Sequence, residues 1–233
     1  MPIPASSVIR RATNIIMDET SVRWPVHELV RWLNDAQRAI VSIRPDAINV
    51  TATVTLAAGA RQDLDNMGLS QLPLKMIGIQ RNMAASSNKN AVTLVPRHLL
   101  DAQQPNWYNI TAAVSIQHYM FDVRDPKTFY VYPPASAAAQ LEVNYSAYPT
   151  DIAEPAAGAT YTDVVGNLTV PDIYDGPVLD LVLYRAYLKD SEFAGNAQRA
   201  ETHRAAAVAA LGGELSATIA VQPQLKPGLS AVG

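Results

Sequence analysis

The chain of 233 residues carries 18 Lys and Arg against 21 Asp and Glu, which gives a net charge of -3, and it contains no cysteine. Without an excess of positive charge, sequence-specific binding to the phosphates of DNA or RNA is not expected. The absence of cysteine excludes disulfides, thiolate metal ligands and thiol catalysis. With 48% apolar residues, a chain of this length is expected to fold as one large or two small domains. No apolar run has the length of a signal peptide or a membrane span, so neither is expected.

The first 45 residues have the period of two amphipathic helices. Val8–Asp18 is predicted to form the first helix. The second is predicted over Pro25–Arg44, because the residue before Pro45 disfavours helical geometry. Gln37 lies on the apolar side of the second helix, where we expect it to cross-link helices by hydrogen bonds rather than to take part in catalysis. The opposite face carries four charged residues at ion-pair spacing: Glu28, Arg31, Asp35 and Arg38.

The hydrophobic period changes from 3.6 to 2 at Asp46. Asn49–Leu56 alternates apolar residues with threonines, which predicts a half-buried strand, and Gln140–Tyr148 alternates in the same way. The Pro-, Ala- and Gly-rich residues 149–170 lead from this β region back to helix. Further strands are predicted at Arg61–Leu64, Leu74–Arg81, Val92–Val95, Gln117–Val123 and Thr128–Tyr132, with a short helix at Arg97–Gln103.

Pro177–Lys189 is apolar over most of its helical circumference, which indicates a buried helix. Pro177 suits the first turn, where its missing N–H has no cost. Asp180 falls inside the apolar arc, and a buried carboxylate persists only when it is paired or hydrogen-bonded. It is either a catalytic or ligand-binding group or a structural one bonded to a tyrosine or arginine. Because no second catalytic group lies near it in sequence, we expect the structural role.

A last helix is predicted from Asn196 to Leu211, and the pair Gly212-Gly213 is expected to end it. Residues 214–233 contain Pro223 and Pro227 and are predicted to form an extended tail. Four apolar residues in this tail have mostly even spacing, as in an extended strand that docks on another chain: Ile219, Val221, Leu225 and Leu229.

The predicted helices lie at the two ends of the chain, and the β region lies between them. The terminal helices can pack together only if the β region is an insertion in the helical domain. We therefore predict an α+β fold. A helical bundle is expected from residues 1–45 and 171–213, with an inserted antiparallel β domain at residues 46–170 and the extended C-terminal tail at residues 214–233.

Motifs that carry chemistry are missing from the sequence. It has no glycine-rich phosphate loop and no GxSxG nucleophile elbow. The histidines lie in different predicted elements and lack the spacing of metal ligands: His27, His98, His118 and His203. No catalytic residue, cofactor or metal is therefore expected, and the protein is predicted not to be an enzyme.

Two other functions have some support in the residues. Asp101, Asp122 and Asp125 could supply a carboxylate pair for a hydrolase, although Asp-x-x-Asp-Pro is ordinary turn sequence. A β-rich carbohydrate- or receptor-binding module of a phage or bacterial particle could use the aromatic residues of the β region: Trp107, Tyr108, Tyr119, Tyr130 and Tyr132. Aromatic residues in strands more often form core or cross-strand pairs.

The segment VRWPVHELVRWLNDAQRAIVSIRPDA resembles the opening of the head-to-tail adaptor (connector) proteins of tailed bacteriophages, relatives of podovirus tail tubular protein A. The resemblance covers most of residues 8–211, and the order and spacing of the blocks carry it. The other similar blocks are AAGARQDLD, IGIQRN, the step Pro105-Asn106-Trp107, DVRDPKTFYVYPP and VPDIYDGPVLDLVLYRAYLKDSEFAGNAQRAETH.

The resemblance implies a structural protein of the virion, located at the head-tail interface. Such adaptors form a ring, commonly of twelve copies, that continues the DNA channel from the portal protein and offers a platform for tail or nozzle proteins. DNA passes through without sequence-specific binding, which suits the mild acidity of the chain, and no membrane is involved. In such a ring the charged face of Pro25–Arg44 could meet a neighbouring subunit, and the C-terminal tail could dock on the portal or the adjacent copy.

Overall fold

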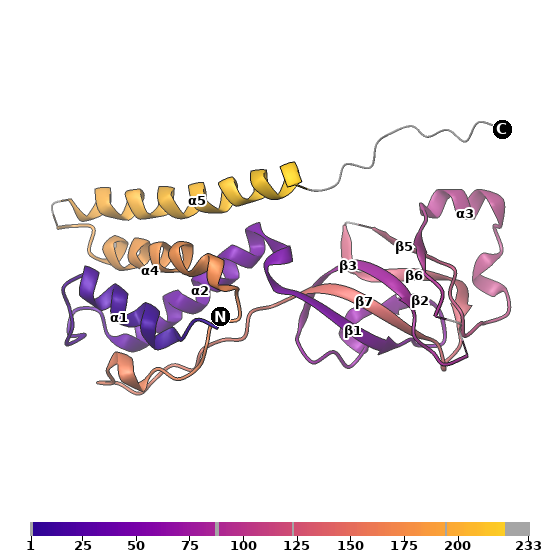
Figure 1. Ribbon diagram of the computed structural model, residues 1–233, viewed down its shortest axis with the longest axis horizontal. Coiled ribbons are helices and arrows are strands. Elements are labelled where there is room, and N and C mark those ends of the chain that lie inside the picture. Colours follow the sequence, from indigo (N-terminus) through magenta and orange to yellow (C-terminus); the bar gives the residue numbers. More distant parts are fainter. Residues whose placement is uncertain (1, 87–88, 123, 194, 222–233) are drawn as a thin grey trace. The chain divides into compact units, whose positions relative to one another are not determined.

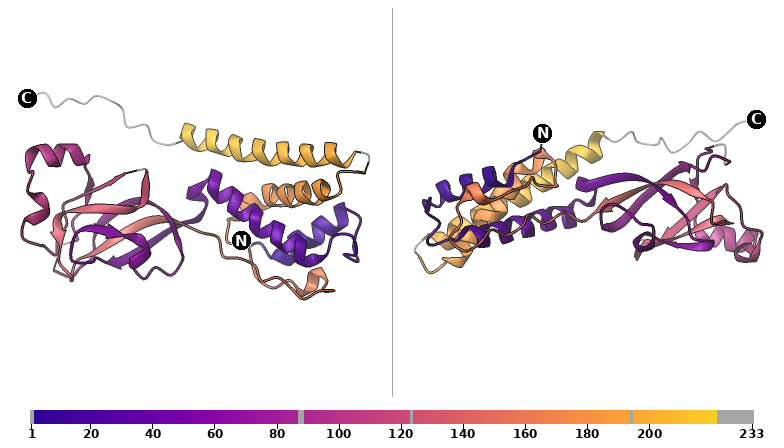
Figure 2. Two further views of the ribbon diagram at one scale, coloured as in Figure 1. Left: turned by 180° about the vertical axis from the view of Figure 1, so that it is seen from behind. Right: turned by 90° about the horizontal axis from the view of Figure 1, so that it is seen from below.

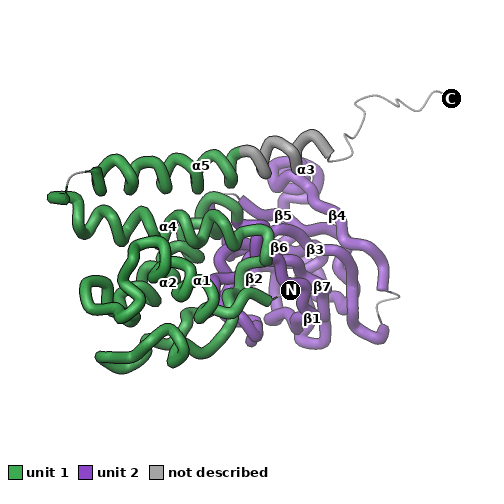
Figure 3. The backbone as a smooth tube through the Cα atoms, turned by 60° about the vertical axis from the view of Figure 1, so that its left-hand side comes forward, with its two compact units in different colours: residues 1–44, 151–233 green, residues 45–150 purple. Residues whose placement is uncertain are grey.

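The computed structural model describes the chain except for residues 1, 87–88, 123, 194 and 222–233, and for residues 213–221 it describes the backbone alone. The chain divides into two compact units, residues 1–44 with 151–233, and residues 45–150 (Figure 3). Four of the five described α-helices belong to the first unit, and the described strands belong to the second. The α+β fold class predicted from the sequence is confirmed.

Helix α4 lies at the centre of the first unit. It spans Asp175–Lys189 and contacts the other three helices, which are α1 (Ala5–Ile15), α2 (Val26–Ile43) and α5 (Asn196–Val221). Figures 1 and 2 show α5 running alongside α4. Helix α4 is largely buried, as its sequence predicts, with Leu183, Ala186 and Tyr187 inside the unit. The pattern placed Val178 and Val182 on the side facing water, but both are fully buried, whereas Leu188 is exposed.

The start of α4 is fixed by charge as well as by Pro177. The helix begins two residues before that proline, at Asp175, whose carboxylate pairs with Arg11 of α1 at 2.5 Å. A carboxylate in the first turn also interacts favourably with the positive end of the helix dipole. Arg11 therefore joins α1 to the N-terminus of the central helix.

Residues 151–170 pack with the helices, whereas the sequence pattern had placed them in the β region. The amide of Ala5 donates to the carbonyl of Gly166 at 3.0 Å, and the amide of Leu168 donates to the carbonyl of Ile3 at 2.9 Å. Ile152, Leu168 and Val170 are buried against the helical unit. The β unit thus ends at Thr150, and the helical unit gains an irregular segment that the sequence did not indicate.

Helix α5 continues through Gly212-Gly213 to Val221, so the predicted helix end at Leu211 is wrong. The extended tail predicted for residues 214–233 is also wrong for residues 214–221. The helix formers Leu211, Glu214 and Leu215 flank the glycine pair and outweigh its cost of about 1 kcal/mol per residue. Ile219 and Val221 lie in the last helical turns rather than in an extended strand, and Leu225 and Leu229 lie outside the described residues.

Two small sheets form the core of the second unit. One sheet has the order β1-β7-β3, with β1 at Asn49–Thr55, β7 at Gln140–Ala147 and β3 at Pro73–Asn82. The other has the order β2-β6-β5-β4, and its strands are Gly59–Asp63, Asp125–Ala135, His118–Asp122 and Thr93–Leu94. The first sheet is antiparallel, as predicted, but the two-residue β4 pairs parallel to β5, so the second sheet is mixed.

Helix α3, at Arg97–Gln103, forms where the sequence predicts it. It covers a small apolar cluster with the fully buried Trp107 at its centre, against which Tyr130 and Tyr132 pack from β6. Ala60, Leu100 and Met120 complete this cluster. Most of the aromatic surface of the β unit is therefore used for packing.

The continuation of α5 can be tested at Gly212. A Cβ placed on Gly212 meets no atom within 4 Å, and its backbone is not left-handed. Gly212→Ala should therefore raise the free energy of unfolding by about 0.5–1 kcal/mol, because alanine loses less backbone entropy in a helix. The measurement is thermal unfolding followed by circular dichroism.

Gly195 is the matched control, because a Cβ there also meets no atom within 4 Å but its φ is +88°. Gly195→Ala should destabilise the protein by about 1–2 kcal/mol, the cost of a left-handed alanine. If Gly212→Ala destabilises to a similar extent, α5 ends at the glycine pair.

Candidate functional site

The histidines and carboxylates of the described residues are not assembled into a metal centre. No group of three or more His, Asp or Glu side chains in this part of the chain is placed to hold a metal ion. Each described histidine lies in a separate element, as expected. Within the same part of the chain, no helix combines the length and apolar character that a bilayer crossing needs.

Asp180 is placed between α4 and α5. Its Oδ1 lies 2.9 Å from Nδ1 of His203 on α5, so the partner is a histidine rather than the expected tyrosine or arginine. The His203 ring stacks on Tyr187 with a centroid distance of 5.7 Å and an interplanar angle of 8°. Both side chains of the pair are about a quarter exposed, at 28% for Asp180 and 26% for His203. The arrangement joins two helices, which agrees with a structural role for this carboxylate.

Gln37 is completely buried on α2, and its Oε1 accepts a hydrogen bond from the backbone N–H of Thr169 at 2.8 Å. It therefore binds the segment that leads into α4, whereas the sequence pattern suggested a link between helices. Among the described residues, its Nε2 has no hydrogen-bond partner.

Asn34, one turn before Gln37, binds the other end of the same segment, and the sequence analysis missed it. Its Nδ2 donates to the carbonyl of Ile152 at 3.0 Å, and its Oδ1 accepts from the backbone N–H of Ile152 at 2.9 Å. The available signal was two amides three residues apart, between Val30 and Val41 on a buried face of α2. Such a pair on an apolar face indicates that irregular backbone packs there.

The charged face of α2 is engaged within its own chain. Arg31 donates to Glu154 at 2.8 Å, and this hydrogen bond lowers the pKa of the glutamate. Arg38 pairs with both Asp35 and Asp151, and Glu28 pairs with Lys189 of α4. These pairs are partly exposed, so each contributes modestly, but together they hold residues 151–154 and α4 against α2. The face therefore forms ion pairs within its own chain while its side chains stay partly exposed, and a contact with a neighbouring subunit stays a prediction.

Two of the three carboxylates of the hydrolase alternative have ordinary partners. Asp101 accepts from the Trp107 indole N–H at 2.8 Å. Asp122 accepts from the side chain of Arg124 at 2.6 Å and from its backbone N–H at 2.9 Å. These hydrogen bonds lower the pKa of Asp122 to about 2, so this group is fully ionised at neutral pH and cannot act as a general acid.

Two of the five aromatic residues of the sugar-binding alternative are buried in the β unit, Tyr130 and Tyr132 are half-buried, and Tyr108 is exposed. Trp107 is fully buried, and Tyr119 is 7% exposed. Tyr108 stacks on Trp107 with a centroid distance of 3.7 Å, and the guanidinium of Arg97 lies over the rings of Tyr108 and Tyr130. Burial is the main cause of the raised pKa of Tyr108.

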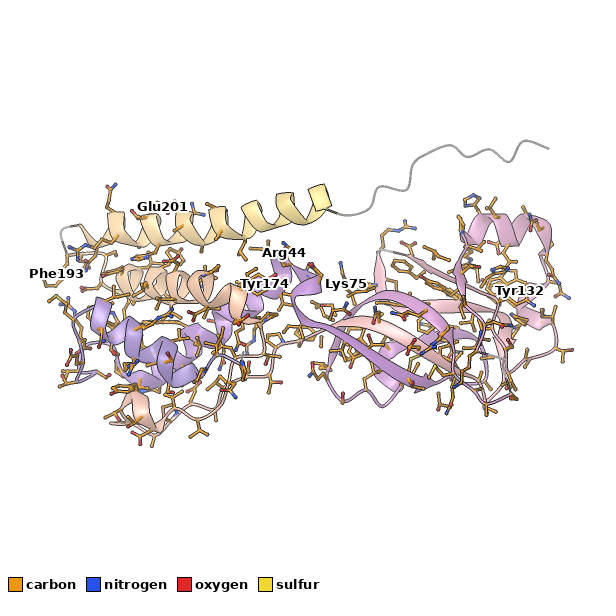
Figure 4. The ribbon with its side chains drawn as sticks, in the orientation of Figure 1. Arg44, Lys75, Tyr132, Tyr174, Phe193 and Glu201 are labelled. Atoms are coloured by element: carbon orange, nitrogen blue, oxygen red, sulfur yellow. The ribbon has the colours of Figure 1, made fainter. Side chains whose placement is uncertain are left out.

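A hollow of about 440 Å³ lies beside this cluster, between α3 and β5. Tyr132, labelled in Figure 4, closes one side of it and donates its hydroxyl to Oε1 of Gln104 at 2.6 Å. The other lining side chains are aliphatic, amide or imidazole groups: Val95, Leu99, Leu100, Gln103, Gln117 and His118. The hollow therefore offers hydroxyl, amide and imidazole groups for hydrogen bonding, and Nδ1 of His118 lies 2.6 Å from the hydroxyl of Thr93 on β4.

The exposed side of α5 is charged in the first turns of the helix and uncharged in the turns that directly follow. Its first turns carry Arg199, Glu201 and Arg204, of which the last two pair with each other (Glu201 is labelled in Figure 4). The buried side is narrow and consists of small residues and Leu211. Over residues 205–210 the exposed side is small and uncharged: Ala205, Ala206, Val208, Ala209 and Ala210. A helix with such a surface can approach another backbone closely.

The sequence matches the family described as SU10 adaptor protein over residues 3–227, and the chain belongs to that family. The family confirms the resemblance to phage adaptor proteins, whereas the narrower relation to podovirus tail tubular protein A stays a prediction. No curated protein matches the chain.

The contributions to stability of the buried amide–backbone hydrogen bonds and of the partly exposed Asp180–His203 pair can be compared by mutation. Asn34→Ala should lower the free energy of unfolding by about 2–3 kcal/mol, because it strands both backbone groups of the buried Ile152. Asp180→Ala should lower it by about 1 kcal/mol or less, since solvent screens this partly exposed pair. Urea unfolding of both variants checks the order, and a larger loss for Asp180→Ala would contradict it.

The pKa of Asp122 offers a direct test of the hydrolase alternative. In an NMR titration its carboxyl should titrate at about pH 2, and Arg124→Ala should raise this value toward the ordinary 3.8. The direction follows because the hydrogen bonds from Arg124 favour the charged carboxylate. A value well above 4 in the unaltered protein would point instead to a catalytic acid.

Proposed function

We propose that this protein is a structural component of a phage virion that forms a ring between the portal vertex of the capsid and the tail. The observation that carries the proposal is the match to the adaptor family over residues 3–227. In this role its partners are the portal protein, a tail or nozzle protein and further copies of itself, twelve in the complete ring. The ring continues the DNA channel, and the net charge of -3 suits a wall along which DNA slides without sequence-specific binding.

The two compact units suit a ring of identical subunits. We propose that the helices contributed by both ends of the chain act as one bundle, with residues 45–150 as a domain inserted between α2 and the segment before α4. A closed ring needs two different surfaces on each subunit that complement each other. The small, uncharged side of α5 supports its assignment as one of them.

The C-terminal part of the chain is proposed as the docking element for the portal or the adjacent subunit. Ile219 and Val221 would contribute from the last turns of α5, and Leu225 and Leu229 from the residues beyond it. Docking by apolar residues at a chain end adds contact area without altering either compact unit.

Coexpression with the portal protein of the same phage genome tests the proposal. The mass of the purified complex, measured by native mass spectrometry, should correspond to a portal ring carrying a ring of this protein. Ala205→Arg combined with Ala209→Arg should abolish the second ring while leaving the melting temperature unchanged, because both positions are exposed on α5. Ala102→Arg, at an exposed position of α3, is the matched control.

A chain that ends after Val221 separates the role of the last residues from that of the helix. It keeps α5 whole, so it should melt like the full chain but attach weakly to the portal. If the full-length protein neither binds portal nor forms rings on portal-bearing heads, the adaptor function is wrong. Normal attachment of the shortened chain would contradict only the docking role of residues 222–233.

A further inference from the structure

Strand β1 is an open edge with the properties that favour strand addition. Its seven residues pair with β7 without a register shift, and no other strand of the described residues pairs with its second edge. It has no charged residue and no proline. On its outer face Thr51, Thr53 and Thr55 are exposed, and on its inner face Val50 and Ala52 are only half-buried. Another strand beside β1 would cover these inner residues and satisfy its free backbone groups.

The other three sheet edges carry features that discourage strand addition. Strand β3 begins at a proline, has three register shifts, and is bridged near its end by Ala91. Strand β2 has a register shift between Gly59 and Arg61 and presents charged side chains. Strand β4 has two residues. Bulges, charges, proline and short length are the devices by which edges avoid pairing, and β1 has none of them.

The five central residues of β1 read the same in both directions. Val50-Thr51-Ala52-Thr53-Val54 is a palindrome centred on Ala52. When two copies of this strand pair antiparallel about Ala52, Val50 lies opposite Val54 and Thr51 lies opposite Thr53. Both copies then present threonines on one face and apolar residues on the other, so the faces of the two sheets match.

We propose that the free protein forms a two-fold dimer through antiparallel pairing of β1 with β1 of a second copy. The occupant of the edge is a second copy because the palindrome makes the edge self-complementary, as an isologous interface requires. The two three-stranded sheets join into one of six strands, in the order β3-β7-β1-β1-β7-β3. Cross-strand threonine pairs and valine pairs stabilise such a junction.

Charge substitutions on the exposed face test the pairing without disturbing the core. With Thr51→Lys and Thr53→Lys together, each lysine lies opposite a lysine of the other copy, so dimer affinity should fall about tenfold. With Thr51→Glu and Thr53→Lys together, each glutamate lies opposite a lysine, so dimerisation should be kept. The two double variants alter the same two positions, so they differ only in the charge at residue 51. Sedimentation equilibrium of the full chain reports the mass, which is 25.2 kDa for the monomer.

The absence of cysteine allows a second test by crosslinking. With Ala52→Cys the two sulfurs face each other across the two-fold axis, where Cα atoms lie about 4.5–5.5 Å apart, within the range of a disulfide. With Thr51→Cys the new cysteine lies opposite Thr53, and the two copies of it are diagonal neighbours at about 7–8 Å. Under mild oxidation, Ala52→Cys should therefore form the dimeric disulfide about tenfold faster than Thr51→Cys.

A full chain that is dimeric, sensitive to the lysine pair, restored by the glutamate–lysine pair and crosslinked at residue 52 supports the proposal. A chain that stays monomeric up to its solubility limit overturns it. A dimer with equal affinity in both charge variants, or with equal crosslinking at residues 51 and 52, also overturns it, because the contact then lies elsewhere. None of these outcomes depends on whether the protein binds portal.

Discussion

The helical unit depends on one constraint, which is that the chain leaves it after α2 and must return to it before α4. Residues 151–170 make this return with one short 3-10 helix, Tyr161–Asp163, and are otherwise irregular, so many of their backbone groups need partners from outside the segment. Asn34 and Gln37 supply them from adjacent turns of α2, binding Ile152 and Thr169, close to the two ends of the segment. Because this segment leads into α4, the amides of α2 also determine where the central helix enters the unit.

The ion pairs around α2 follow from the same constraint. Arg31 and Arg38 bind Glu154 and Asp151, next to the residue that Asn34 holds. The charged face of α2 looks solvated in sequence, but its ion pairs also hold the returning segment against the helix. Buried amides fix the position of the backbone, and exposed pairs add little energy but favour the same arrangement.

The sequence predicts helices and strands that have a local hydrophobic period. It does not predict features that depend on contacts between residues far apart in the chain. The long periodic runs of α2 and α4 and the alternation in β1 and β7 are reproduced within about two residues at each end. Residues 151–170 belong to the helical unit because side-chain amides of α2 bind their backbone across more than a hundred positions of sequence. A hydrophobic period describes only neighbouring residues, so it cannot indicate such contacts. Strand β4 lies within the predicted strand Val92–Val95, but its parallel pairing with β5 is not indicated by its sequence.

The errors at functional positions have equally specific causes. The glycine pair in α5 is a good stop signal, but a stop also requires a left-handed residue, and Gly212 is not left-handed. Asp180 was correctly expected to have a partner, yet nothing in its own helix identifies His203. Asn34 could have been recognised, because an asparagine and a glutamine three residues apart on a buried face need acceptors and donors from other backbone.

The proposed ring and the proposed dimer make different demands on symmetry. A two-fold contact uses the same surface of both subunits and is complete with two copies. A ring needs two different surfaces on each subunit, and it closes only if the rotation between neighbours, or a template, allows it. The uncharged side of α5 belongs to the helical unit and β1 belongs to the other, so substitutions on one leave the other intact. A protein whose ring closes only on another component benefits from a second contact that covers its open strand edge beforehand, because an uncovered edge also pairs with unrelated chains.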